Sequence, residues 1–528
     1  GSQFIVKNKT IQFSLSKYDK SQTVIIDPSI LWSTYYGGIG SDIIQSVVTD
    51  KQGNIFIAGT TTSTFNISTL NGYTGFSMAG FIGKFDQYGN RLWSEYISPV
   101  SMNEIDNHPP ELTLNDMCID FEGNIIICGN YRNAKLFSTK FTQGEAKNGL
   151  GFVSKLDNNG QLLWSADYAP GGDIVGVICD LKGDVFIVGN ILTKNILKNN
   201  YYVSPNTHQQ NIGGGMEDGF VAKLSALNGQ RIWGTFYGGV AYDHFEDVCV
   251  DGFGDVLATG YTDSPDNIST ANNINGAADA FIVKFDNITG TRMWGTYYGG
   301  PNIDEGTGIA IDNNGLIYLV GTTRSQTGIA YDLFKNQIPG FQTIHQETYG
   351  GGFTDGFIAK FHSRNGQLWL GTYYGGDDQD ILTSVTIDKN NKVYVAGTTF
   401  SSTIQSDCDL PLNKNHGSED AILACFSENG RRNWGIYYGG SGMDEGLSVA
   451  ISNTGALYMA GKTQSNYNMA CSNGNPQWNI HQNYFGGWRD GLLVRFTNLS
   501  CELKNAVALI IPEIEADGGI NCPPRKKQ

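Results

Sequence analysis

Aspartates recur at two fixed positions along this sequence, and they are the first candidates for chemistry. The members of the first series stand eight residues before the end of an apolar run: Asp42, Asp243, Asp304, Asp380 and Asp444. Carboxylate oxygens are hard ligands of the kind that Ca²⁺ binds. A ring of them near a central channel would therefore form a calcium site, and no other cofactor is expected. The alternative is that each Asp accepts backbone N–H bonds and caps a turn, and repetition in every regular unit favours this alternative.

The second acidic series stands just before a different apolar run. Its members are Asp218, Asp279, Asp355, Asp420 and Asp490. Basic residues recur inside that same run, at Lys84, Lys155, Lys223, Lys284, Lys360 and Arg495. An Asp ends the first run in most units, at positions 50, 120, 180, 251, 312 and 388. Because a partly buried charge needs a partner, these Lys and Asp residues are predicted to pair within each unit.

Three histidines, His208, His345 and His481, precede Gly-rich turns and look at first like a metal set. Each stands nine or ten residues before its own Asp, in a different repeat. Repeats that are not neighbours would hold them far apart, so they are predicted to order loops.

Four aromatic residues break the repetition: Trp478, Tyr484, Phe485 and Trp488. Such a group could stack on sugar rings or fill a pocket of a protein partner. The alternative is that these side chains pack their own loop. The sequence contains no GxSxG, HExxH, Walker or GxGxxG motif in a suitable setting, so no catalytic residue and no enzyme activity are predicted. The abundant carboxylates leave a glycosidase or lyase pair open.

The elements that position these residues are defined by a repeated Trp. Tryptophans at 32, 93, 164, 233, 294, 369 and 434 are 61 to 75 residues apart. Each period holds four short apolar runs, rich in β-branched and aromatic residues and bounded by Gly, Asn and Asp, which is typical of strands. We call the Asp-ending run A, the Gly-ending run B, the Lys-containing run C and the Trp run D. Four antiparallel strands repeated seven times predict an all-β, seven-bladed β-propeller.

The order of the runs predicts how the ring closes. The first Trp run precedes the first run A, and no Trp run follows the last run C near Phe496. The strand around Trp32 should therefore complete the last blade and remove an exposed edge.

The D-to-A and B-to-C connections should share one face of the ring. The B-to-C connections are long and unlike one another, as in 191–217, 323–354 and 463–489. Variable loops on a rigid scaffold often carry function, so this face is the predicted binding face, unless the loops only wrap the blade edges.

The repeats resemble the SBBP family, the bacterial seven-bladed beta-propeller repeat. The stretches that carry the resemblance are 34–38 (TYYGG), 58–61 (AGTT) and 279–281 (DAF). The units at Trp93 and Trp164 depart from it because they lack the Tyr-Tyr-Gly-Gly ending. The resemblance implies a secreted or surface-displayed bacterial multidomain protein, including adhesion proteins, and it implies no agreed activity.

Three segments are expected. Residues 1–29 would be a β-segment at the end of an upstream domain, 30–497 the propeller, and 498–528 a linker or the start of a further domain. Of the nine cysteines, Cys118, Cys128, Cys179 and Cys249 lie in strand-like runs and are predicted to be small core residues. Whether Cys501 and Cys522 form a disulfide stays open.

The net charge of −16 disfavours nucleic acid and anionic membrane surfaces as partners. No apolar run approaches the ~20 residues that span a bilayer.

The leading hypothesis is a non-enzymatic, extracellular or cell-surface propeller, monomeric within a larger chain, that binds a protein or glycan through its B-to-C loops. One alternative is a rigid spacer with no ligand of its own. Another is a polysaccharide-active hydrolase or lyase that uses channel carboxylates.

Overall fold

The structure is a computed structural model. It describes residues 2–7, 10–15, 30–71, 77–97, 100–101, 111–132, 134–135, 141–142, 150–170, 172–195, 201–333, 335, 344–402, 404, 415–467, 469–471 and 480–496. Two short strands near the start, β1 (Ser2–Lys7) and β2 (Thr10–Leu15), pair with each other in antiparallel fashion. Within the described residues, no helix is long and apolar enough to cross a membrane.

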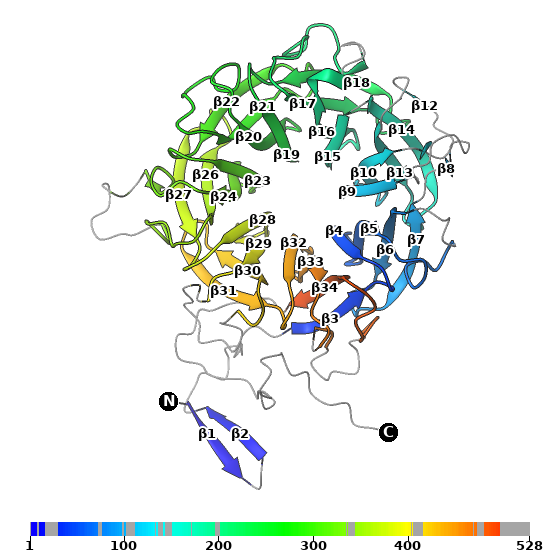
Figure 1. Cartoon of the computed structure of the whole chain (residues 1–528), viewed down its shortest axis with the longest axis vertical. Coiled ribbons are helices and arrows are strands. Elements are labelled where there is room, and N and C mark those ends of the chain that lie inside the picture. The colour runs from blue at the N-terminus through cyan, green and yellow to red at the C-terminus, as the bar shows by residue number, and fades with distance from the viewer. Residues whose placement is uncertain are drawn as a thin grey trace.

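The strands that follow form seven sheets arranged in a ring, as predicted (Figure 1). Blade 1 contains β4 (Asp42–Thr49), β5 (Ile55–Thr61), β6 (Ala79–Phe85) and β7 (Arg91–Ile97). Blade 2 contains β9 (Glu111–Ile119), β10 (Ile125–Arg132), β13 (Leu150–Leu156) and β14 (Leu162–Pro170). Blade 3 contains β15 (Gly172–Cys179), β16 (Val185–Leu192), β17 (Glu217–Leu224) and β18 (Arg231–Tyr237). Blade 4 contains β19 (Asp243–Val250), β20 (Val256–Thr262), β21 (Asp279–Phe285) and β22 (Arg292–Tyr298), and blade 5 contains β23 (Asp304–Ile311), β24 (Leu316–Thr323), β26 (Asp355–His362) and β27 (Leu368–Tyr374). Blade 6 contains β28 (Asp380–Ile387), β29 (Val393–Thr399), β30 (Asp420–Phe426) and β31 (Arg432–Tyr438). Blade 7 contains β32 (Asp444–Ile451), β33 (Leu457–Thr463), β34 (Asp490–Phe496) and β3 (Ile30–Tyr36).

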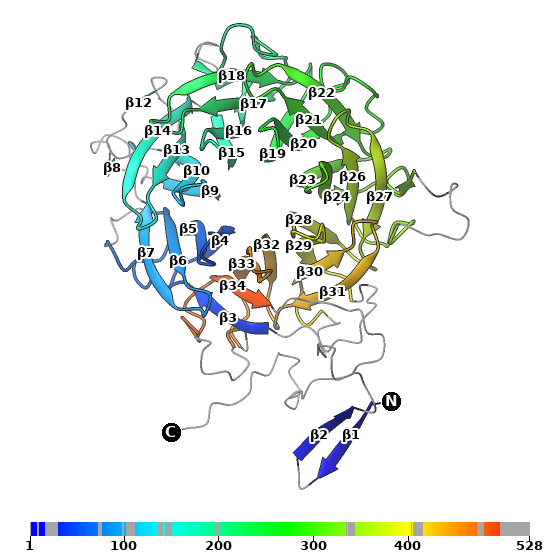
Figure 2. The ribbon, with the colours of Figure 1, turned by 180° about the vertical axis from the view of Figure 1, so that it is seen from behind.

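The A strands surround the ring centre and the D strands lie at the rim (Figures 1 and 2). The middle strands are buried on both faces because each blade is packed between two others. All seven residues of β5 and of β6 are buried, for example. The hydrophobic cores lie between neighbouring blades. One of them joins Trp32 and Leu493 of blade 7 to Ile44, Ile57 and Phe81 of blade 1.

The ring is closed by the N-terminal Trp strand, as the sequence predicted. β3 pairs with β34 in antiparallel register, from Ile30 opposite Phe496 to Tyr36 opposite Gly491. On its outer edge, the amide of Ser33 donates to the carbonyl of Cys471 (2.8 Å). Blade 7 is thus one sheet built from two distant parts of the chain.

The two units that depart from the repeat, at Trp93 and Trp164, supply the D strands of blades 1 and 2. Blade 1 keeps four strands, whereas blade 2 is irregular. Its sheet gains a fifth strand, β12 (Phe141–Thr142), which runs parallel to β14. A separate two-stranded sheet forms from β8 (Val100–Ser101) and β11 (Ala134–Lys135). Blade 5 also gains a short edge strand, β25 (Tyr331–Asp332), on β27.

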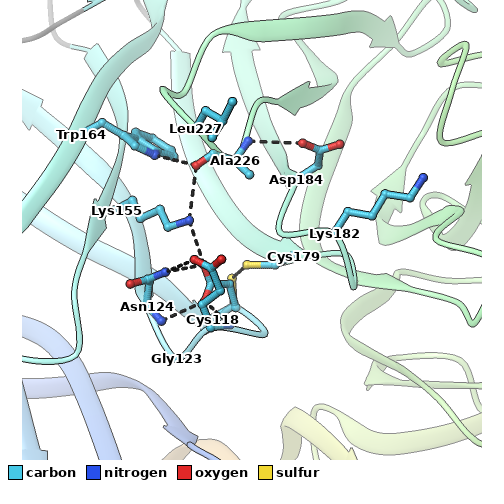
Figure 3. Close-up of polar contacts among 12 residues, drawn as sticks. Cys118, Gly123, Asn124, Lys155, Trp164, Cys179, Lys182, Asp184, Ala226 and Leu227 are labelled. Atoms are coloured by element: carbon cyan, nitrogen blue, oxygen red, sulfur yellow. Dashed lines mark hydrogen bonds and ion pairs between the residues drawn. The ribbon is translucent and has the colours of Figure 1, made fainter.

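Blades 1, 2, 3 and 7 are each fastened to the next blade by the basic residue of the C strand and the Trp of the D strand, which donate to the same residue. Figure 3 shows this contact between blades 2 and 3. Trp164 Nε1 (3.1 Å) and Lys155 Nζ (3.3 Å) both donate to the carbonyl of Ala226 in the C-to-D turn of blade 3. Lys155 also forms a buried ion pair with Asp120 at 2.8 Å. The corresponding carbonyls that accept from Trp32, Trp93, Trp233 and Trp294 are those of Gln87, Asn158, Asn287 and Ser363. In blade 6 the basic position is Cys425, and Trp434 Nε1 has no hydrogen-bond partner among the described residues.

The predicted pairing of Lys and Asp within a blade is present in three described blades. Besides Lys155 with Asp120, Lys223 lies 3.5 Å from Asp180 and Lys284 lies 2.7 Å from Asp251. In blade 5, Lys360 instead donates to the carbonyl of Glu428 at 2.6 Å. The basic residue therefore joins strands within a blade and joins one blade to the next.

Candidate functional site: the loop face of the ring

The D-to-A and B-to-C connections meet on one side of the ring, which we call the loop face. Ser41, in the connection from β3 to β4, forms a parallel bridge with Arg489 at the end of the B-to-C connection of blade 7. The carbonyl of Ser41 also accepts from the amide of Thr62, just after β5. The A-to-B turns are short, as in 51–54, and lie at the opposite ends of the strands.

The first Asp series lies at this face but inside the protein. Asp42 has no exposed surface. Its Oδ1 accepts from the Thr61 hydroxyl, and its Oδ2 accepts from the Gly38 amide (2.9 Å) and the Ser63 hydroxyl (2.7 Å). Equivalent Thr, Gly and Ser donors surround Asp243, Asp304 and Asp380, and Asp444 accepts from the same Gly and Ser positions. These are the contacts of the turn-capping alternative, and they lie between blades instead of lining the ring centre.

Each regular interface pairs the two Asp series across a glycine. A Cβ atom on Gly37 would lie 2.5 Å from Asp42 Oδ2 and 2.9 Å from Asp490 Oδ1, so only glycine fits between the two carboxylates. Asp490 Oδ2 accepts from the Gly486 amide (2.8 Å) and from Gln482 (3.0 Å), whereas its buried Oδ1 has no hydrogen-bond partner among the described residues. The same oxygen is unpartnered in Asp218, Asp279, Asp355 and Asp420.

The chemistry of these pairs follows from their burial. The pKa of Asp490 is raised to about 7, first by burial and then by the charge of the facing Asp42. The pKa of each of Asp218, Asp279, Asp355 and Asp420 is also raised to about 7, first by burial and then by the facing Asp. Two carboxylates this close do not ionise together easily. Among the described residues, no group of three or more His, Cys, Asp or Glu side chains could hold a metal ion.

The three repeated histidines pack against aromatic rings, each at a different blade interface. The His481 ring lies 5.8 Å from the Tyr36 ring and 5.6 Å from the Phe85 ring. Burial, with Arg91 nearby, lowers its pKa to about 3. His208 and His345 make the same kind of contact with Tyr237 and Tyr374. They order loops, as the sequence indicated.

The structure separates the members of the predicted aromatic group. Trp478 lies outside the described residues, as do Cys501 and Cys522. Trp488 is 87% exposed and Tyr484 is 58% exposed. Phe485 is half-buried and its ring packs edge-on against Tyr35, with centroids 6.0 Å apart. Two of the three described residues are therefore free to contact a partner, and the third holds the loop to the core.

A cluster that sequence reasoning missed lies at the loop face of blades 3 and 4. His244, the second residue of β19, has Nδ1 2.7 Å from Glu217 Oε1, at the start of β17. Its Nε2 lies 3.5 Å from Glu246 Oε1 and 3.1 Å from Asn190 Nδ2. A register shift between Phe245 and Asp247 makes Glu246 a bulge residue, outside the regular ladder.

Two tyrosines extend this cluster, which we call the His244 cluster (Glu217, Tyr242, His244, Glu246 and Tyr261). The rings of Tyr242 and His244 are nearly parallel, 3° apart in orientation with centroids 5.9 Å apart. Tyr261 stacks on both, at 5.7 and 5.1 Å. All five side chains are partly exposed.

The electrostatics of the His244 cluster are acidic. Burial alone would lower the pKa of His244, but its hydrogen bond to Glu217 and the charges of Glu246, Glu217 and Asp173 raise it overall. Burial raises the pKa of Glu246, which also faces Glu305 of the next blade. The carboxylates thus outnumber the single imidazole that they surround, and aromatic faces lie beside them. Such a surface attracts ammonium and guanidinium groups.

The sequence held one signal for this cluster, because His244 replaces a residue that is Ile or Glu in four other blades. The corresponding positions are Ile43, Glu305, Ile381 and Glu445. Tyr242 and Glu246 flank His244 in the chain, whereas Tyr261 comes from β20 and Glu217 from β17 of blade 3, so the approach of Glu217 depends on how blades 3 and 4 pack. The only clue was therefore one unusual residue inside a repeat.

Comparisons with known proteins agree with the geometry of the ring. Residues 31–66 and 294–326 match the SBBP family, described as a beta-propeller repeat. The chain is 22% identical over 532 residues to the "Uncharacterized WD repeat-containing protein L264" of Acanthamoeba polyphaga mimivirus. That alignment covers 85% of this chain but only 37% of the viral protein, so the chain spans little more than a third of that relative.

Two solved structures are similar to the chain at low identity. A Dos1 propeller is 11% identical with a TM-score of 0.40, covering 87% of this chain and 94% of its own. The quinohemoprotein alcohol dehydrogenase of Comamonas testosteroni is 10% identical with a TM-score of 0.40, and the alignment covers 95% of this chain and 78% of the dehydrogenase chain. These similarities concern the fold alone.

Proposed function

We propose that this chain, a ring of SBBP-type beta-propeller repeats, is a non-enzymatic binding module whose loop face receives a basic segment of a protein partner. The observation that carries the proposal is the His244 cluster. It is the acidic and aromatic group on the loop face that departs from the repeat. A ring of identical blades offers similar chemistry all round, so a departure from the repeat is where selectivity for one partner can arise.

A basic peptide suits this surface better than a neutral ligand. Glu217 and Glu246 lie on either side of the His244 ring, 2.7 and 3.5 Å from its nitrogens. A Lys or Arg side chain could take over contacts with these carboxylates and lie over the stacked rings of Tyr242 and Tyr261. The net charge of −16 supports the choice, because it attracts basic partners over long range.

A glycan partner remains the second candidate because of Trp488. Its ring is 87% exposed beside Tyr484 in the blade 7 loop, and such aromatic platforms stack on sugar rings. A secreted or cell-surface location, which rests on the family resemblance, would suit either partner. A rigid spacer without a ligand is the function that remains if neither surface binds.

The test uses fluorescent hexapeptides of Lys and Arg, with an acidic hexapeptide as the negative probe. We expect the wild-type chain to bind the basic probes. Changing Glu217→Gln and Glu246→Gln together should weaken binding by roughly tenfold, equivalent to about 1.4 kcal/mol. The matched control is Glu122→Gln, an exposed Glu in an A-to-B turn of the opposite face, which should leave the affinity unchanged.

Equal affinity of the double variant and the wild type would exclude the His244 cluster as the site. A glycan array with wild type and Trp488→Ala separates the second candidate. Loss of a glycan signal in Trp488→Ala alone would assign binding to the blade 7 loop instead. If no peptide and no glycan binds, the rigid spacer without a ligand is the favoured function.

A further inference from the structure

Two cysteine sulfurs from neighbouring blades lie against each other near the ring centre. Cys118 is on β9, the inner strand of blade 2, and Cys179 ends β15, the inner strand of blade 3. Their Sγ atoms are 2.7 Å apart (Figure 3). This is closer than the ~3.5–4.0 Å at which non-bonded carbon atoms lie in best contact, and sulfur is the larger atom. The side chains therefore point directly at each other.

The interface that holds this pair lacks the carboxylate pair found between regular blades. At the position of Asp218, blade 2 has Leu150, and at the position of Asp243, blade 3 has Gly172. The sequence after Tyr168 reads Ala169-Pro170-Gly171, without the Gly-Gly pair that follows the Tyr in the regular units. Blades 2 and 3 are thus joined without a carboxylate pair, and the thiol pair lies on their inner strands.

We propose that Cys118 and Cys179 form a disulfide that joins blade 2 to blade 3. The contact lies between inner strands of consecutive sheets, whose packing against each other holds the two sulfurs in place. A disulfide between residues 61 positions apart would close a long loop. Cross-links of long loops restrict the unfolded chain most.

The two thiols have different roles in forming the bond. Cys118 is only 5% exposed, whereas Cys179 is partly exposed. The Cys179 thiolate attacks a disulfide oxidant such as oxidised glutathione, forming a mixed disulfide and releasing one glutathione thiolate. The Cys118 thiolate then attacks the Cys179 sulfur and displaces the second glutathione. In sum, the protein loses two hydrogens, and one glutathione disulfide is reduced to two thiols.

The experiment is cysteine mapping on the full chain. The reduced protein is incubated with oxidised glutathione, unfolded in the presence of iodoacetamide, digested and analysed by mass spectrometry. We expect a cross-linked pair of peptides containing Cys118 and Cys179, which separates on reduction. Cys249→Ser, a change on the inner strand of the next blade, is the matched control and should keep the cross-link. Cys118→Ser should abolish it and leave Cys179 open to alkylation or glutathionylation.

Two results with the wild-type protein would overturn the proposal, so neither depends on a variant folding. Full alkylation of both cysteines in the oxidised wild type would do so. So would a mixed disulfide with glutathione at Cys179 that never resolves. A melting temperature that is higher in the oxidised than in the reduced wild type, with no such difference in Cys118→Ser, would support a cross-link that stabilises the ring.

Discussion

At the scale of single residues, the buried Asp pairs between blades are the groups most sensitive to pH. Asp355 is buried, and Gly375 lies between its Oδ1 and Oδ2 of Asp380. Its pKa is raised to about 7 by burial and by Asp380. The pKa of an unfolded Asp is about 3.9. Between about pH 4 and pH 7 the folded state therefore holds a proton that the unfolded state lacks, so stability falls as pH rises through this window.

The variant Asp355→Asn should remove the loss of folding stability that Asp355 causes as pH rises. The amide is neutral at every pH, so it resembles the protonated acid beside Asp380. We expect its melting temperature, relative to wild type, to improve by a few degrees as pH rises from 5 to 8. Differential scanning calorimetry at several pH values measures the difference.

A control distinguishes the pair from an ordinary Asp. The pKa of Asp286 is lowered, chiefly by the hydrogen bond from the Thr289 side chain. Asp286→Asn should thus shift the melting temperature by an amount that stays constant between pH 5 and pH 8. If Asp355→Asn behaves in the same way, Asp355 is ionised in the folded protein and the two carboxylates share no proton.

Lys155 is a second residue whose removal should be costly. Its side chain and that of Asp120 are both nearly fully buried, so Lys155→Met would leave a buried carboxylate without its cation. Loss of one partner of a buried ion pair costs about 3–5 kcal/mol. We expect a marked drop in the urea midpoint of unfolding. The control is Lys335→Met, whose pair with Glu347 is exposed and worth under about 1 kcal/mol.

Equal effects of Lys155→Met and Lys335→Met would mean that the contact between blades 2 and 3 does not depend on the buried charge. In that case, Trp164 and the apolar core would hold the two blades together.

At the scale of elements, the strands and their order could be predicted from the sequence because each apolar run carries its own signal. The runs around Trp32 and Phe496 predicted β3 and β34, and the absence of a final Trp run predicted their pairing. The site could not be predicted as well. Asp42 and Asp490, or Cys118 and Cys179, become neighbours only through the packing of whole blades. Periodicity finds elements, whereas contacts between elements depend on the geometry of the closed ring.

The closing strand gives the clearest prediction at this scale. Deleting residues 30–37 would leave β34 as an exposed edge with unpaired backbone groups and would remove Trp32 and Tyr36 from the core. We expect a melting temperature lower by more than about 10 °C, since several kcal/mol of burial is lost, and concentration-dependent association through the free edge. Calorimetry and size-exclusion chromatography measure these effects.

Deleting residues 2–15, which form β1 and β2, is the control for the closing strand. These strands pair with each other and belong to no blade, so the ring should keep its melting temperature. A ring that tolerates the loss of 30–37 equally well would show that closure by β3 contributes little to stability.

At the scale of the whole molecule, the ring places its regular and irregular parts on different arcs. The five carboxylate pairs occupy the interfaces from blade 3 through blade 7 to blade 1. The two interfaces around blade 2 lack them, because Ala79 and Leu112 stand at the corresponding positions between blades 1 and 2. The His244 cluster lies where the regular arc begins. The His244 cluster therefore adjoins the first carboxylate pair, because Glu217 and His244 are the chain neighbours of Asp218 and Asp243.

The pairing of β3 with β34 also sets an order of events during protein synthesis. The ribosome completes β3 first, but its partner emerges roughly 450 residues later, which takes about 20–90 s at about 5–20 residues per second. Throughout that interval β3 carries Trp32, Tyr35 and Tyr36 without the sheet that buries them. Blades 1 to 6 can form meanwhile, since each is continuous in the chain. The last blade forms only when the beginning and the end of the ring meet, so a ribosome that stalls before Asp490 leaves an aromatic strand free to pair with other nascent chains.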